Sequence, residues 1–314
     1  MKYGFGVDLG GTTVKIACFE ECGNMMDKWE IPTVTENNGE KILPDIGASL
    51  NAYMAQKGLN KENMIGIGIG VPGPVVDKHI VTGCDNLGWG RVDVREVLSS
   101  MTGLKVCAGN DANMAALGES WKGGGKGCRN MVLVTLGTGV GGGIIVEGKQ
   151  LCGVHGAGGE IGHMVLEPNE GEYCNCGKRG CVEQFCSATG IVRMAKQYLA
   201  KNDRESSLRN VEKLTCKDVF DAAAANDAAA GEILHKVYDY MGQFIANICC
   251  VADPEVVVLG GGVSKAGKPL LEGAKKAFDR YVYHASSAIR FALADLGNDA
   301  GAYGAFKLVL DEFG

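Results

Sequence analysis

The sequence predicts an α/β protein with two halves of similar build. Apolar segments rich in β-branched residues alternate with helical segments along the chain, which is the pattern of the α/β class. A strand, a glycine turn and a second strand occur twice, over residues 3–19 and again over residues 130–148. A chain of 314 residues also has the length of about two ordinary domains.

After the first hairpin the chain is expected to continue as helix, strand, helix, strand and helix. These elements are predicted at 41–57, 64–71, 92–100, 104–108 and 112–121. The second half is expected to be helical over 188–201 and 215–251, with a buried strand at 255–259 and a final helix at 300–313. Apolar residues recur at helical spacing from Ile233 to Val251 and predict a core-facing stripe.

Composition excludes several classes of function. The net charge is −6 and no basic run is present, which argues against nucleic acid or an anionic membrane as a partner. No apolar run approaches the roughly 20 residues that a membrane span needs. The amino terminus enters a strand pattern directly, without a signal region, so a cytoplasmic protein is expected. An odd number of cysteines, 13, favours thiols and a metal site over disulfides.

The first glycine turn has the composition of a phosphate-binding hairpin. Gly10 and Gly11 follow a strand, so backbone N–H groups can face an anion without an intervening Cβ. Thr12 can add a hydroxyl donor, and Asp8 can hold Mg²⁺ through water. A plain hairpin turn with a charged rim is the alternative. No Gly-Lys-Ser/Thr follows, so this is not a Walker A loop.

Two further glycine turns follow strands. The segment from Gly137 through Thr138 and Gly139 to Gly142 matches G-x-G-x-x-G, but a strand comes next where a dinucleotide site needs a helix. A second phosphate-facing hairpin is therefore predicted. The triplet 260–262, which includes Gly261 and Gly262, could let an adenine or ribose lie on the backbone; a plain turn is the alternative.

The strongest local signal is His163 followed by Cys174, Cys176 and Cys181, with the spacing H-x10-C-x-C-x4-C. Three thiolates and an imidazole form the closed tetrahedral set of a structural zinc site. Four protein ligands leave no open position, which argues against a zinc-dependent hydrolase. Four unrelated residues in a cysteine-rich chain are the alternative.

Carboxylates near these loops can complete an active site. Asn110 and Asp111 follow a strand and precede a helix, where Asp111 could be the helix cap or could accept a proton from a substrate hydroxyl. Glu160 and Glu183 flank the predicted zinc ligands, which would fix both carboxylates for paired sugar hydroxyls. Solvent-facing glutamates are the default alternative.

Taken together, these motifs resemble the ROK family of repressors, open reading frames and sugar kinases. Six blocks carry the resemblance along the whole chain: DLGGTTVK at 8–15, GNDAN at 109–113, LGTGVGGGII at 136–145, GAGGEIGH at 156–163, CNCGKRGCVEQ at 174–184 and VVVLGGGVS at 256–264. The resemblance implies the actin-like, ribonuclease H-like ATPase fold, two α/β domains with a ligand cleft between them. We expect a smaller domain of residues 1–117 plus 300–314 and a larger one of residues 118–299.

The resemblance also implies roles for single residues. Asp111 would be the general base. Sugar contacts are expected at Asn86, Asn110, Asp111, Glu160, His163 and Glu183. ATP contacts are expected at Asp8, Gly10, Gly11, Thr12, Lys15, Gly137, Thr138, Gly139, Gly261 and Gly262. His163 would serve both sugar and zinc, beside Cys174, Cys176 and Cys181.

Within the family, the segments at 85–90 and 172–195 look like the bacterial glucokinases. The resemblance thus implies phosphorylation of a hexose at its 6-hydroxyl, from glucose and ATP with Mg²⁺. Alternatives are a kinase for N-acetylglucosamine, N-acetylmannosamine, mannose or fructose, or a catalytically silent sugar-binding regulator. A repressor is not expected, because no helix-turn-helix fits before Asp8. A homodimer is expected because symmetric dimers are common.

Overall fold

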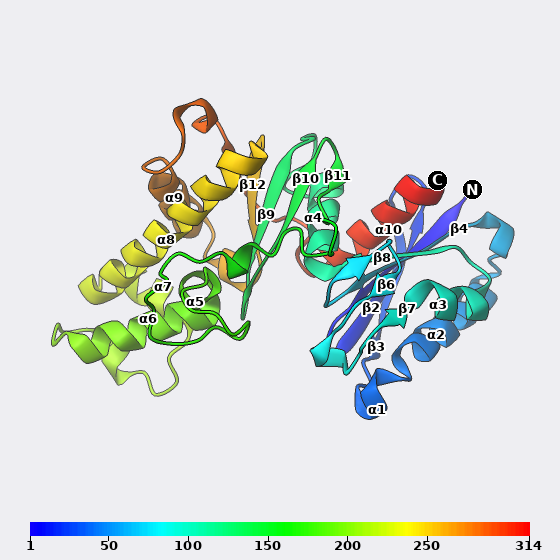
Figure 1. The fold of residues 1–314 in the computed structure, drawn as a ribbon, viewed down its shortest axis with the longest axis horizontal. Helices are drawn as coiled ribbons and strands as arrows, with labels where there is room; N and C mark the ends of the chain where they lie inside the picture. The colour runs from blue at the N-terminus through cyan, green and yellow to red at the C-terminus, as the bar shows by residue number, and fades with distance from the viewer. The chain divides into compact units, whose positions relative to one another are not determined.

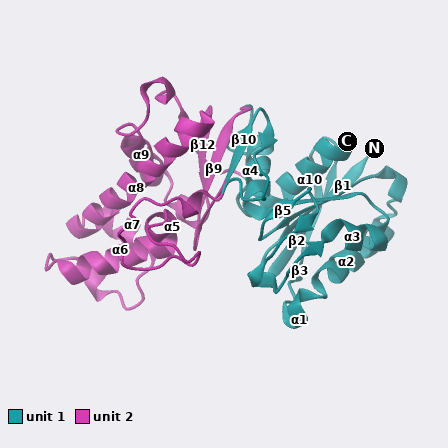
Figure 2. Cartoon of the chain, in the orientation of Figure 1, with its two compact units in different colours: residues 1–127, 143–159, 296–314 teal, residues 128–142, 160–295 magenta.

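The computed structural model describes residues 1–314 and divides into two compact units. Unit 1 comprises residues 1–127, 143–159 and 296–314, and unit 2 comprises residues 128–142 and 160–295 (Figure 2). The carboxyl-terminal segment therefore returns to the unit that the amino terminus begins. None of the helices has the combination of length and hydrophobicity that a membrane-spanning segment needs.

Unit 1 is built on a five-stranded sheet with the strand order β3-β2-β1-β4-β8 (Figure 1). Its strands are β1 (Tyr3–Leu9), β2 (Thr13–Glu20), β3 (Met25–Pro32), β4 (Met64–Val71) and β8 (Val106–Asn110). The strands β1, β4 and β8 are parallel, whereas β2 and β3 extend the sheet in antiparallel fashion. The carboxyl ends of the three parallel strands therefore meet at one edge, where ligands bind in open α/β sheets.

The remaining elements of unit 1 cover this sheet or connect its strands. They are α1 (Glu36–Gly39), α2 (Ile42–Lys57), α3 (Val94–Thr102), α4 (Asp111–Lys122), α10 (Ala300–Phe313) and a small sheet of β5 (Val75–Val76), β6 (Ile80–Val81) and β7 (Val92–Asp93). The strand β11 (Lys149–Gln150) also falls within unit 1, but it pairs with β10 in the second sheet. The helices α2, α4 and α10 and the strand β4 match the sequence prediction in type and to within a residue at the start of each element.

Glycines let α10 pack closely on β4 and α4. A Cβ on Gly68 of β4 would lie 1.9 Å from the carbonyl oxygen of Ala305, and one on Gly304 would lie 1.6 Å from that of Met114. Both distances are far too short for a side chain, so these positions bring helix and strand backbones into contact. The alternating residues Ile67 and Ile69 are fully buried in the core on the other face of the sheet.

Unit 2 contains most of a second five-stranded sheet with the order β11-β10-β9-β12-β13. Its strands are β9 (Met131–Leu136), β10 (Val140–Val146), β12 (Val256–Gly260) and β13 (Arg290–Leu293), and the division between the units falls within β10. The helices are α5 (Glu183–Cys186), α6 (Ala188–Lys201), α7 (Cys216–Ala224), α8 (Ala228–Ala252) and α9 (Lys268–Phe278). The strands β9, β12 and β13 are parallel, so their carboxyl ends also share an edge.

Several sequence predictions need correction. The helix expected at 92–100 begins at Val94, because Val92–Asp93 pairs with β6 and Asp93 caps the helix. The stretch expected to be helical over 215–251 is two helices, separated where Asp227 caps α8. Val251, expected at the end of the core stripe, is 87% exposed.

Candidate active site and metal centre

Strand register brings Asp8 to the same edge of the unit 1 sheet as Asn110 and Asp111. Asp8 pairs with Gly70 of β4, and Gly70 pairs with Gly109 of β8. Asn110 ends β8, and Asp111 begins α4 directly after it. Gly70 lies close to α4, since a Cβ there would lie 3.2 Å from Met114 Cγ, which is tighter than most real contacts. The parallel strands therefore carry two carboxylates to their common carboxyl edge.

Asp8 is a half-buried carboxylate with a cationic neighbour. Burial raises its pKa, and the nearby Lys15 opposes that shift. The Lys15 Nζ lies 3.8 Å from Asp8 Oδ2. Gly301 at the start of α10 lets this helix approach the Asp8 carboxylate, because a Cβ there would lie only 2.7 Å from Asp8 Cγ. A divalent cation at this carboxylate would favour its ionised form.

The turn after β1 exposes its backbone. Gly10 N–H donates to Thr13 O at 3.0 Å, and the Thr33 hydroxyl donates to Gly10 O at 2.7 Å. Gly11 and Thr12 are exposed at the tip, and a Cβ on Gly11 would meet nothing within 4 Å. A braced turn with an open tip suits an anionic group that approaches the backbone.

The helix cap belongs to Asn110, not to Asp111. The side-chain oxygen of Asn110 accepts from the N–H groups of Ala112 and Asn113 at 3.0 and 3.2 Å, and its amide donates to Gly73 O at 3.3 Å. Asp111 stands at the first helical position, and its Oδ1 accepts from Ala112 N–H at 2.8 Å. Since Asn110 already supplies the cap, the cap function does not account for Asp111.

Asn86 is an exposed residue of a short 3-10 turn, Asp85–Leu87. The turn is anchored by the buried Cys84, whose thiol donates to Pro72 O at 2.6 Å. Burial raises the pKa of Cys84, and the charge of Asp111 adds to the shift. Because Pro72 directly follows β4, the bond from Cys84 places this turn beside the carboxyl edge.

In unit 2, two predicted glycine turns meet. We call residues 137–140 the phosphate hairpin; Gly137 N–H donates to Gly139 O within it at 2.9 Å. Gly261 follows β12 with φ +82°, and a Cβ on it would lie 2.5 Å from Leu136 O. Only glycine accommodates both the left-handed backbone and this approach. The turn at 261–262 therefore lies against the end of β9, beside the hairpin.

A pocket of about 300 Å³ adjoins the turn at 261–262. Its walls come from α7 and the segment after β12 and include Cys216, Phe220, Gly262 and Val263. An aromatic ring, aliphatic groups and an open glycine backbone can enclose a flat heterocycle such as adenine. The α7 residues were not predicted from the sequence, because their apolar spacing resembles that of an ordinary core helix.

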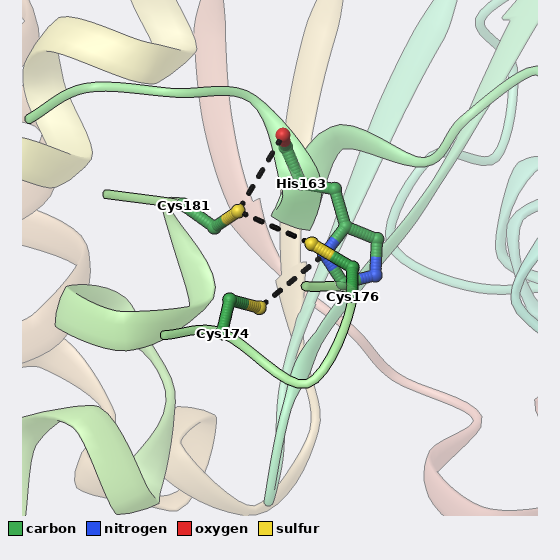
Figure 3. Close-up of side chains that lie close together, drawn as sticks. All are labelled: His163, Cys174, Cys176 and Cys181. Atoms are coloured by element: carbon green, nitrogen blue, oxygen red, sulfur yellow. Dashed lines mark hydrogen bonds between the residues drawn. The ribbon is translucent and has the colours of Figure 1, made fainter. Parts of the chain in front are cut away.

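The structure brings the four predicted metal ligands together (Figure 3). All ligand atoms of His163, Cys174, Cys176 and Cys181 lie within 4.8 Å of one another. Cys176 Sγ lies 3.6 Å from Cys181 Sγ, and Cys174 Sγ lies 3.7 Å from His163 Nδ1. Sulfurs about 2.3 Å from a tetrahedral zinc would be about 3.8 Å apart, so the cluster suits zinc.

The loop that carries the cysteines, residues 174–181, is called the metal loop below. Burial raises the pKa of Cys181 to about 12, and the neighbouring thiols add to the shift. Such crowding disfavours three thiolates unless a cation compensates their charge, which is what a zinc ion would do. The second ring nitrogen of His163, Nε2, points away from the sulfurs (Figure 3), and the residue is partly exposed.

The two glutamates near the cluster differ in their surroundings. Glu160 is exposed at the start of a 3-10 turn, and its carbonyl accepts from His163 N–H at 3.2 Å. Glu183 is half-buried; its Oε2 accepts from Val140 N–H at 3.0 Å, and its Oε1 lies 3.7 Å from Cys174 Sγ. Glu183 therefore connects the metal loop with the phosphate hairpin, a role that its sequence position did not indicate.

Comparison with known proteins identifies the family. The model of the ROK family matches residues 4–312. The chain belongs to the ROK family. It is 44% identical to the glucokinase of Halalkalibacterium halodurans over 97% of this chain and 94% of the relative. It is 35% identical to the glucokinase of Thermotoga maritima over 98% of both chains.

A solved structure supports the predicted fold. The ROK family glucokinase from Streptomyces griseus, solved in complex with glucose and AMPPNP, is 30% identical, with a TM-score of 0.76 over 98% of both chains. Family and fold agreement confirm the predicted α/β class and actin-like ATPase fold. The predicted site residues form two sets, one around Asp8 and Asp111 in unit 1 and one around the hairpin and the metal loop in unit 2.

Proposed function

We propose that this ROK family protein is an ATP-dependent hexokinase that converts glucose to glucose 6-phosphate. The main support is its 44% identity to a glucokinase over 97% of the chain. The carboxylates at the sheet edge and the nucleotide-sized pocket in unit 2 are consistent with that activity.

Asp111 is the proposed general base. Its carboxylate would accept the proton of the sugar 6-hydroxyl as that oxygen bonds to the γ-phosphorus and the bond to ADP breaks. Phosphoryl transfer has a loose transition state, so position matters more than base strength. Asn110, whose side chain caps α4 and bonds to Gly73, keeps the start of this helix in place. Asn86, Glu160, Glu183 and His163 Nε2 are proposed to bind the other hydroxyl groups of the sugar.

The nucleotide would be held by backbone and by small side chains. Asp8 would hold Mg²⁺ through water, and Lys15 would face the phosphates beside it. The N–H groups of Gly10, Gly11 and Thr12 and of Gly137, Thr138 and Gly139 would bind phosphate oxygens. Gly261 and Gly262 would border the adenine or ribose. Magnesium supplies charge neutralisation for the transferred phosphoryl group.

The proposed zinc ion has a structural role. His163, Cys174, Cys176 and Cys181 would fill the coordination sphere, so zinc would stabilise the loop and take no part in proton or phosphoryl transfer. We further propose that the protein is a cytoplasmic homodimer. Its functional domains would be residues 1–117 plus 300–314 and residues 118–299.

The test is ADP release from MgATP with glucose, N-acetylglucosamine, N-acetylmannosamine, mannose and fructose, compared by kcat/KM. The highest kcat/KM is expected for glucose. A higher value for an acetylated sugar would overturn the glucose assignment and keep the kinase. Sugar binding by calorimetry without any turnover would instead indicate a regulator.

A further inference from the structure

Gln184 is a buried polar side chain that holds the metal loop from inside. Its Oε1 accepts from Gly180 N–H at 2.7 Å and from Cys181 N–H at 3.1 Å. Its Nε2 donates to Glu172 O at 3.1 Å, on the chain just before the loop. With 8% of its surface exposed, the side chain makes these three bonds away from bulk water. Gln184 therefore joins the end of the metal loop to the segment that precedes it.

The preceding residue contacts the other functional loop of unit 2. Glu183 Oε2 bonds to Val140 N–H at 3.0 Å, and its Oε1 lies 3.7 Å from Cys174 Sγ. A Cβ on Gly139 would lie 2.2 Å from Glu183 Oε2, so the hairpin and the carboxylate are in direct contact. Both residues belong to the single turn α5, which fixes their side chains relative to each other.

The segment that follows α5 holds the same hairpin by two more bonds. Ala188 N–H donates to Gly137 O at 2.8 Å, and the Thr189 hydroxyl donates to Thr138 O at 2.7 Å. Ser187 links this segment back to α5, because its hydroxyl donates to Glu183 O at 2.7 Å. The phosphate hairpin is thus attached to residues 183–189 along its whole length.

We infer that Gln184 is a positioning residue that couples the metal loop to the phosphate hairpin, so that metal loss loosens nucleotide binding. Zinc orders the metal loop, Gln184 fixes α5 against that loop, and Glu183 with residues 188–189 fixes the hairpin against α5. The nucleotide part of this inference rests on the proposed function, and the link between metal and hairpin does not.

The first experiment compares Gln184→Leu with Gln197→Leu in the zinc-loaded protein. Gln197 also contacts Glu172, through its side chain at 3.0 Å, but bonds to no residue of the metal loop. Outer-shell changes cost about 10- to 100-fold in metal affinity, so Gln184→Leu should release zinc to a competing chelating dye at a dye concentration at least about 10-fold lower. It should also weaken MgATP binding measured by calorimetry without sugar. Gln197→Leu should match the wild type in both measurements.

A second experiment needs no variant, which protects the test if Gln184→Leu does not fold. Hydrogen exchange is measured on the wild type before and after zinc is removed by a chelator. Peptides that cover 136–140 should lose protection, and peptides that cover β1 and β2 should not. Unchanged protection at 136–140, or wild-type zinc release from a folded Gln184→Leu, would overturn the inference. If zinc removal loosens the phosphate hairpin but no sugar is phosphorylated, the inference stands and the proposed kinase activity is refuted.

Discussion

Gly139→Ala is expected to damage activity without damaging the fold. The new Cβ would lie 2.2 Å from Glu183 Oε2, about 1.2 Å less than the 3.4 Å at which ordinary contact begins. Glu183 is the far end of a flexible side chain, so it should rotate away and lose its 3.0 Å bond to Val140 N–H. A hydrogen bond to a charged group contributes about 1.5–3 kcal/mol. If the displaced carboxylate loses this free energy in its proposed contact with the sugar, kcat/KM for glucose should fall about 10- to 150-fold, at about 1.36 kcal/mol per factor of ten.

Gly231→Ala is the matched control, because a Cβ at that exposed position of α8 would meet nothing within 4 Å. It should leave kcat/KM unchanged and stabilise the helix by up to about 1 kcal/mol. Both variants are assayed by coupled ADP release and by thermal unfolding. Activity of Gly139→Ala within twofold of the wild type would refute the argument, as would a large fall in its Tm.

Three further predictions concern the metal, the nucleotide pocket and acid stability. Cys176→Ser should lose zinc by atomic absorption and weaken sugar binding, whereas Cys250→Ser, an exposed cysteine outside the cluster, should keep full metal content; retained zinc in Cys176→Ser would refute the ligand set. Phe220→Ala should raise the KM for MgATP about 10-fold, because a base stacked on an aromatic ring contributes about 1–3 kcal/mol, and an unchanged KM would remove the base from this pocket. Burial opposes ionisation of Asp227, but bonds from Ala230 N–H, Ser207 and Ser206 outweigh it and lower its pKa to about 2. Its contribution to stability is therefore complete above the unfolded value of 3.8 and is lost as pH falls toward 2. Asp227→Asn, which can still cap α8, should reduce the fall in the free energy of unfolding, measured with urea, between about pH 4 and pH 2. A fall equal to that of the wild type would contradict the assignment.

The sequence predicted the parts of the fold that carry a strong local pattern. The two glycine hairpins, β4 and α10 follow directly from alternation or helical spacing, and the spacing of His163 and the three cysteines predicted a cluster that the fold brings together. The strand β3 and the helix α9 were missed. Only every second residue of β3 is half-buried, and α9 is short and rich in lysine, so neither has a strongly apolar run.

The missed features of the site depend on contacts between residues far apart in the chain. Glu183 and Val140 are 43 positions apart, and no local spacing indicates that the carboxylate reaches that N–H. The same holds for Phe220, which lines one pocket with Gly262 because α7 packs beside the turn after β12. The cap on α4 was a local ambiguity between adjacent Asn110 and Asp111, and either side chain can fill that position.

The most direct test of the central claim is the reaction of MgATP with glucose in the wild type and in Asp111→Ala. ADP and glucose 6-phosphate are measured together, and glucose binding is measured by calorimetry. The wild type should form the two products in equal amounts. Asp111→Ala should bind glucose within a few fold of the wild type and lose about 100-fold or more in kcat, as expected for a lost general base. Product formation by Asp111→Ala at a rate near that of the wild type would contradict the account.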